Sequence, residues 1–106
     1  MGLKENVNRI HSKLSDIYNQ VEISEKQDIK TGNFVQFTVI NENKKLILNI
    51  NKIELENDNF NWSYYSNPDN LGHTVERFSS VNSFQNDVND IFEKNRFSSE
   101  YLQNLN

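Results

Sequence analysis

Acidic side chains gather in the second half of this 106-residue chain, and their chemistry is the most distinctive feature of the sequence. Residues 1–53 carry eight basic and six acidic residues (net +2), whereas residues 54–106 carry three basic and nine acidic residues (net −6). Between Glu54 and Glu93, Arg77 alone opposes eight acids. A half this acidic repels nucleic acid and anionic membrane surfaces, and it attracts a basic partner.

Two groups of carboxylates are the candidate partner-binding residues. The first group lies at the end of the expected third strand and in the turn that follows, and the second recurs every three residues along an expected helix. Together with Tyr65, whose strand parity predicts exposure, the predicted binding set comprises Glu54, Glu56, Asp58, Asp87, Asp90 and Glu93. Paired carboxylates also occur in glycosidases and magnesium sites, but no supporting residues accompany these acids. The alternative to partner binding is a solvated acidic surface that keeps the protein soluble.

Catalytic and cofactor motifs are missing from the sequence. There is no cysteine, and the two histidines, His11 and His73, lie too far apart for the usual zinc spacings. No Gly-x-Ser-x-Gly, phosphate-loop or His-Glu-x-x-His pattern occurs. We therefore predict no enzymatic activity, no catalytic residue, no metal and no cofactor.

A group of aromatic residues in the second half could stack on a ligand. Its members are Trp62, Tyr64, Tyr65, His73 and Phe78. A stacking platform binds single-stranded nucleic acid when basic residues accompany it, and Arg77 alone is close in sequence. We expect no direct contact with nucleic acid, and we expect Trp62 and Tyr64 to belong to the core.

Two amphipathic helices are predicted at the ends of the chain. Over about 3–20, apolar residues recur at helical spacing, with polar residues between them. This stripe comprises Leu3, Val7, Ile10, Leu14, Ile17 and Val21. A serine N-cap before a second apolar pattern predicts a helix over about 81–94, and a short helix is expected over about 99–105. The first helix either covers a sheet or forms a dimer seam.

Alternation of period two between these helices predicts a sheet. Strands are expected over about 21–29, 34–40, 45–55, 60–66 and 73–79. Because the connections are short, neighbouring strands should be antiparallel. The expected fold is α+β: one domain over residues 1–106, with a four- to five-stranded meander sheet and both helices on one face. We expect Phe37, Leu48, Trp62 and Tyr64 under the helices, and Asn49, Asn51, Asn61 and Ser63 on the opposite face.

The hydropathy of the sequence bears on membrane association and on the cellular compartment. No apolar run exceeds three residues, so the sequence predicts no transmembrane helix. The first fifteen residues are charged and polar, unlike a secretory signal. We therefore expect a cytoplasmic protein that does not bind membranes.

These features together predict a small acidic binding protein without catalytic activity. Its partner would be a basic protein or nucleoprotein, which it would inhibit or neutralise. Immunity proteins, antitoxins and phage anti-defence proteins act in this way on small α+β folds, although the analogy rests on fold alone. The alternative is a homodimeric chaperone or assembly protein that binds through the first helix or through the open sheet face.

Overall fold

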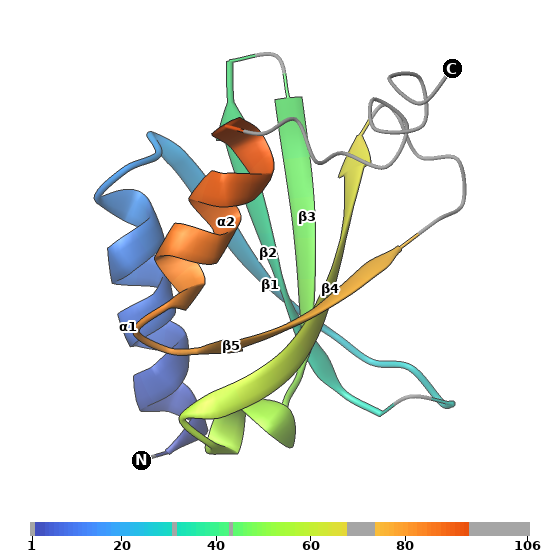
Figure 1. The fold of residues 1–106 in the computed structure, drawn as a ribbon. Coiled ribbons are helices and arrows are strands. Elements are labelled where there is room, and N and C mark those ends of the chain that lie inside the picture. The colour runs from blue at the N-terminus through green and yellow to red at the C-terminus, as the bar shows by residue number, and fades with distance from the viewer. Residues whose placement is uncertain (1, 31, 43, 68–73, 94–106) are drawn as a thin grey trace.

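The computed structural model describes residues 2–30, 32–42, 44–67 and 74–93, and it shows an α+β fold (Figure 1). One antiparallel sheet has the strand order β1-β2-β3-β4-β5, and two helices cover one of its faces. The elements are α1 (Leu3–Ser15), β1 (Gln20–Lys26), β2 (Phe34–Asn41), β3 (Lys44–Asn51), the 3-10 turn η1 (Glu54–Glu56), β4 (Asn59–Asn67), β5 (Val75–Ser80) and α2 (Phe84–Glu93). The predicted meander sheet with both helices on one face is confirmed.

The alternation of each strand divides apolar from polar side chains. In the register, Leu48 of β3 lies between Phe37 of β2 and Tyr64 of β4, and all three are buried under the helices. The same face carries the buried residues Val35, Val39, Leu46, Ile50, Phe60 and Trp62. The expected inward residues are therefore confirmed, and the register places Asn49, Asn51, Asn61 and Ser63 on the opposite face as predicted.

Aromatic rings join α2 to the sheet. The Trp62 ring meets the Phe84 ring edge-on, with centroids 4.7 Å apart, and Phe60 lies 5.4 Å from Phe84. Such tilted and edge-on pairs contribute about 0.5–1.5 kcal/mol beyond their buried area. The buried Trp62 Nε1 donates a hydrogen bond of 2.9 Å to Ser79 Oγ, so its polar atom is also satisfied.

The expected first helix, over 3–20, is too long. It ends at Ser15, where the Ile17 and Tyr18 amides both donate to the Leu14 carbonyl and close the last turn. Tyr18 is then buried against Phe92, with ring centroids 5.2 Å apart, while Ile17 is 46 % exposed. Ile17 and Val21 keep the helical spacing of apolar residues past the end of α1. Ile17 lies in the turn after the helix, and Val21 already belongs to β1.

Two strand boundaries also need correction. The strand expected over 21–29 spans Gln20–Lys26, because the following residues form a hairpin loop in which Asp28 and Gly32 exchange backbone hydrogen bonds. The strand expected over 45–55 ends at Asn51, whose Oδ1 accepts the Ile53 amide and starts the turn into η1. The strands expected over 34–40, 60–66 and 73–79 are found at 34–41, 59–67 and 75–80.

The expected helix over 81–94 begins three residues later, at Phe84. Ser80 and Ser83 form reciprocal bonds, in which each side-chain oxygen accepts the backbone amide of the other residue. The Val81 amide donates to the Asp58 carbonyl, which extends the β4–β5 ladder and keeps residue 81 out of the helix. The helix expected over 99–105 lies outside the described residues.

We predict that Leu14→Ala destabilises the fold by about 2–5 kcal/mol, because Leu14 is fully buried between α1 and the sheet. Urea unfolding measures this difference, and Ile17→Ala is the matched control on the exposed side of the same turn. The control should change the free energy of unfolding by no more than about 0.5 kcal/mol. Equal losses in the two variants would contradict the packing.

We also predict that stability falls between pH 10 and pH 12. Burial and the nearby Glu93 carboxylate raise the pKa of Tyr18 from 10.0 to about 12. The unfolded chain therefore loses this proton first, and the stability present below pH 10 is lost at up to about 1.4 kcal/mol per pH unit. Tyr18→Phe, measured by urea unfolding across this range, should show a shallower decline. Parallel declines in the two proteins would contradict the prediction.

Candidate functional site: a hollow on the open face of the sheet

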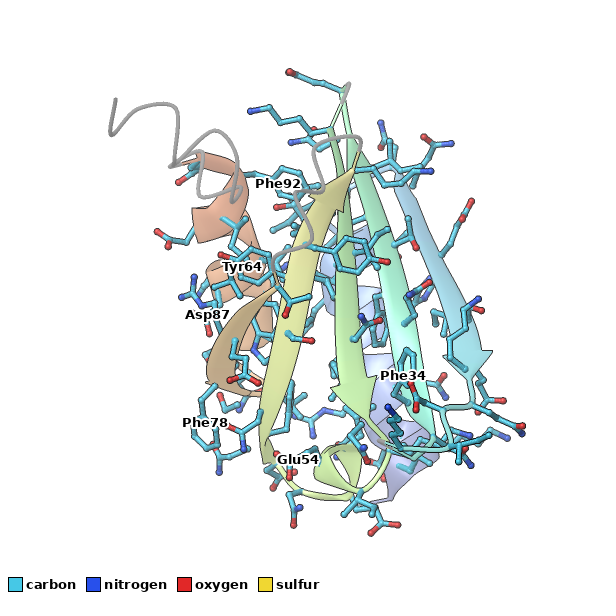
Figure 2. All side chains as sticks on the ribbon, turned by 90° about the vertical axis from the view of Figure 1, so that its right-hand side faces the viewer. Phe34, Glu54, Tyr64, Phe78, Asp87 and Phe92 are labelled. Atoms are coloured by element: carbon cyan, nitrogen blue, oxygen red, sulfur yellow. The ribbon has the colours of Figure 1, made fainter. Side chains whose placement is uncertain are left out.

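The face of the sheet that the helices leave uncovered carries a hollow of about 610 Å³. Figure 2 looks onto this face, with Phe34, Glu54 and Phe78 around the lower half of the sheet. The hollow spans from the β1–β2 loop, across β3 and β4, to β5. Among the residues that the structure describes, its lining comprises Asp28, Phe34, Asn49, Asn51, Glu54, Asn61, Trp62, Ser63 and Glu76, although the Trp62 ring itself packs against Phe84 on the covered face.

The lining is acidic and rich in amides. Among the described lining residues, Asp28, Glu54 and Glu76 carry carboxylates and none is basic. The amide and hydroxyl groups come from alternate positions of β3 and β4, which share the open face. The hollow therefore suits a ligand that is cationic and donates several hydrogen bonds.

Glu54 is held in place by the backbone of β4. Its Oε1 accepts the Asn61 amide at 2.7 Å and the Asn61 side-chain nitrogen at 2.9 Å. The β3–β4 pairing stops at Asn49 and Ser63, so the Asn61 amide has no strand partner and Glu54 supplies the acceptor. Glu54 thus accepts the β4 amide that β3 does not reach, and this bond holds its carboxylate at the edge of the hollow.

The floor of the hollow is ordered by side-chain contacts as well. Gln36 Nε2 donates to Asn49 Oδ1 at 3.1 Å across β2 and β3. Asp28 Oδ1 accepts the Lys30 amide at 2.7 Å, which orders the β1–β2 loop beside the sheet. Positioned polar groups of this kind lose little conformational entropy when a ligand binds.

The first group of expected site residues is only partly brought to the hollow. Glu54 lines it, whereas the exposed Glu56 and Asp58 lie on η1 and the turn after it and are not among the lining residues. Tyr65 shares the open face but lies opposite Ile47, further along β4 than the hollow. Whether these residues contact a partner stays a prediction.

In the second group of expected site residues, Asp87 and Asp90 pair with Arg77 of β5, and a role of this group in partner binding stays a prediction. The guanidinium group of Arg77 forms two ion pairs with α2: Nη2 lies 3.7 Å from Asp87 Oδ1, and Nη1 lies 3.7 Å from Asp90 Oδ2. Asp87 also accepts a hydrogen bond from Ser79 Oγ, which in turn accepts from Trp62. Asp87 and Asp90, which are half-buried, therefore link α2 to β5, whereas Glu93 is exposed.

Sequence reasoning missed three residues of the open face: Asp28, Phe34 and Glu76. The parity of β2 and β5 could have identified Phe34 and Glu76, because both alternate with residues of the covered face. Asp28 comes from the β1–β2 loop, and no local pattern indicates that this loop reaches the hollow. Phe78 is 64 % exposed, which is unusual for a large apolar side chain.

The two histidines offer little to a chemical site. His11 Nε2 donates to the Val21 carbonyl at 3.3 Å, which ties α1 to β1, and His73 lies outside the described residues. Among the residues that the structure describes, no group of three or more histidine, aspartate or glutamate side chains is arranged to hold a metal ion. Nor does any helix in the described ranges have the length and apolar composition needed to cross a membrane.

We predict that Asp87→Lys destabilises the fold by about 1–3 kcal/mol, because it removes the Ser79 acceptor and places a cation beside Arg77. The matched control is Glu93→Lys, an equal change of charge at an exposed position of the same helix. It should alter the free energy of unfolding by no more than about 0.5 kcal/mol. Urea unfolding at neutral pH compares them, and equal stability of the two variants would contradict a structural role for the Asp87 carboxylate.

The chain has no significant similarity to a known protein in three comparisons. No family model matches the chain, and neither a curated protein nor a solved structure matches it significantly.

Proposed function

We propose that the protein is a non-enzymatic binding protein, and that it engages a basic macromolecule through the hollow on the open face of its sheet. The single observation that carries this proposal is the lining: in the part of the chain that the structure describes, three carboxylates and no basic residue surround a concave, amide-rich surface. An inhibitor or neutraliser of a basic protein or nucleoprotein fits this chemistry, in the cytoplasm where such partners act. Immunity, antitoxin and anti-defence roles all belong to this class.

Arginine is the side chain that the hollow fits best. Its planar guanidinium carries five donors, which match carboxylate and amide oxygens, and it stacks on aromatic rings. Glu76 of β5 and Glu54 of η1 supply carboxylates to the lining, and Phe34 of β2 supplies a ring. The exposed ring of Phe78 adds apolar area near the same face.

The alternative of a chaperone that binds through its first helix has less structural support. The apolar face of α1 packs into the core, with Ile10 and Leu14 fully buried, so it is not accessible to a partner. An assembly protein that binds through the open face would use the same hollow. The two roles then differ in the partner and not in the surface.

We predict that Glu76→Lys weakens binding of a fluorescently labelled arginine-rich peptide by about three- to tenfold, because it reverses a charge inside the hollow. Fluorescence anisotropy at low salt measures the affinity. Glu56→Lys is the matched control, since it makes the same change of charge at an exposed position outside the lining. The control should weaken binding by less than about twofold.

Two results would overturn the proposed function. Equal losses for Glu76→Lys and Glu56→Lys would show that the peptide senses net charge alone. No measurable binding of the peptide at low salt would show that the hollow does not accept arginine side chains.

A further inference from the structure

The free edge of β1 is a second surface, independent of the hollow. β1 pairs with β2 alone and forms one edge of the five-stranded sheet, at the right of Figure 2. An edge strand presents unpaired backbone groups that can pair with another strand. In β1 the apolar residues Val21 and Ile23 alternate with polar ones, and Ile23 is 39 % exposed at the centre of the strand.

Alternate residues of β1 direct their backbone N–H and C=O groups toward β2, and the others direct them away from the sheet. The hydrogen-bond pattern of the neighbouring strands shows which residues are which. The Lys52 amide donates to the Asn33 carbonyl at 3.0 Å, so the odd-numbered residues of β2 face β3 and the even-numbered ones face β1. Lys26 pairs with Phe34, and the even-numbered residues of β1 therefore face β2. The amides and carbonyls of the odd-numbered residues point away from the sheet. At Val21 the structure shows this outward direction directly, because His11 donates to its carbonyl.

We propose that a second copy of this chain pairs antiparallel with β1, so that the two sheets join into one across a twofold axis. The axis passes beside Ser24, and Ile23 of each copy lies opposite Glu25 of the other. These outward-facing residues then exchange backbone hydrogen bonds across the axis. In this register Glu22 of each copy lies directly opposite Lys26 of the other, on the open face, which gives two symmetric ion pairs.

The other registers are unfavourable for identifiable reasons. Pairing centred on Glu22 or on Glu25 places identical negative charges directly opposite each other. Pairing centred on Ile23 requires the carbonyl of Val21, which His11 already holds at 3.3 Å. The register centred on Ser24 avoids both problems. Its backbone hydrogen bonds join Ile23 and Glu25, which lie beyond the Val21 carbonyl that His11 of α1 occupies.

The proposed contact also covers exposed apolar surface. Ile23 lies on the helix-covered face of β1, opposite Phe37 in the register. Across the twofold axis its diagonal neighbour is Ile23 of the second copy, at a separation that such side chains can bridge. Pairing therefore shields an isoleucine that the monomer leaves partly in water.

The experiment is sedimentation velocity of the full chain from about 1 µM to about 1 mM, with exchanged charges on the edge. The wild-type protein should shift from monomer to dimer as concentration rises. Glu22→Lys and Lys26→Glu should each weaken the dimer by about tenfold or more, because each replaces two ion pairs with repulsions. The double variant that carries both changes should restore the affinity to within about threefold of wild type.

A backbone variant tests the same contact without relying on charge. Glu25→Pro removes an outward-facing amide, together with the exposed ion pair between Glu25 and Lys52, and leaves the β1–β2 backbone bonds in place. It should therefore abolish the dimer while the circular dichroism spectrum is unchanged. Glu56→Lys is the charge-matched control and should dimerise like wild type. A monomer throughout the concentration range would overturn the proposal. A dimer that the exchanged charges and the proline leave unaffected would also overturn it, and would assign dimerisation to another surface.

Discussion

The strict alternation of side chains across one antiparallel sheet is the constraint on which the rest of the structure depends. Phe37, Leu48 and Tyr64 align across three strands and bury the helix-covered face. Because the period is two, the same register sends a row of amides and hydroxyls to the other face. A slip of one residue in β3 would bury Asn49 and expose Leu48, so core packing fixes which strand residues line the hollow.

The acidity of the second half is divided between two physical roles. Asp87 and Asp90 meet Arg77 where α2 packs beside β5, and the Ser79 hydroxyl links Asp87 to Trp62. These acids stabilise the helix–sheet contact. Glu54 and Glu76, together with Asp28 from the first half, remain at the open face. The net charge of residues 54–106 therefore overestimates the acidic surface on α2. It also leaves out Asp28, which the β1–β2 loop contributes to the open face.

The order of elements and the inward residues could be predicted because strands and helices differ in period. The apolar alternation at Val35, Phe37 and Val39 has a single interpretation, and the structure confirms it. Boundaries were less predictable where apolar spacing carried over from one element to the next. Ile17 continues the helical stripe but faces water, since the helix end is decided by the burial of Tyr18 against Phe92.

The candidate site was harder to predict than the fold because it depends on contacts between distant segments. Glu54 could be identified from the sequence, yet its bond to Asn61 follows only from the early end of β3. Asp28 reaches the hollow through a hairpin loop that local propensity cannot orient. The pairing of Arg77 with α2 likewise requires the parity of β5 and the position of the helix together.

The central claim is that the open face of the sheet, and not the helical face, receives a basic partner. The most direct measurement is mapping of backbone amide chemical shifts while an arginine-rich peptide is titrated into the protein. The account predicts that the largest changes cluster on the amides of Asn49, Asn61 and Ser63 and fade toward α2. Changes concentrated on α2, or spread evenly over the surface, would contradict it.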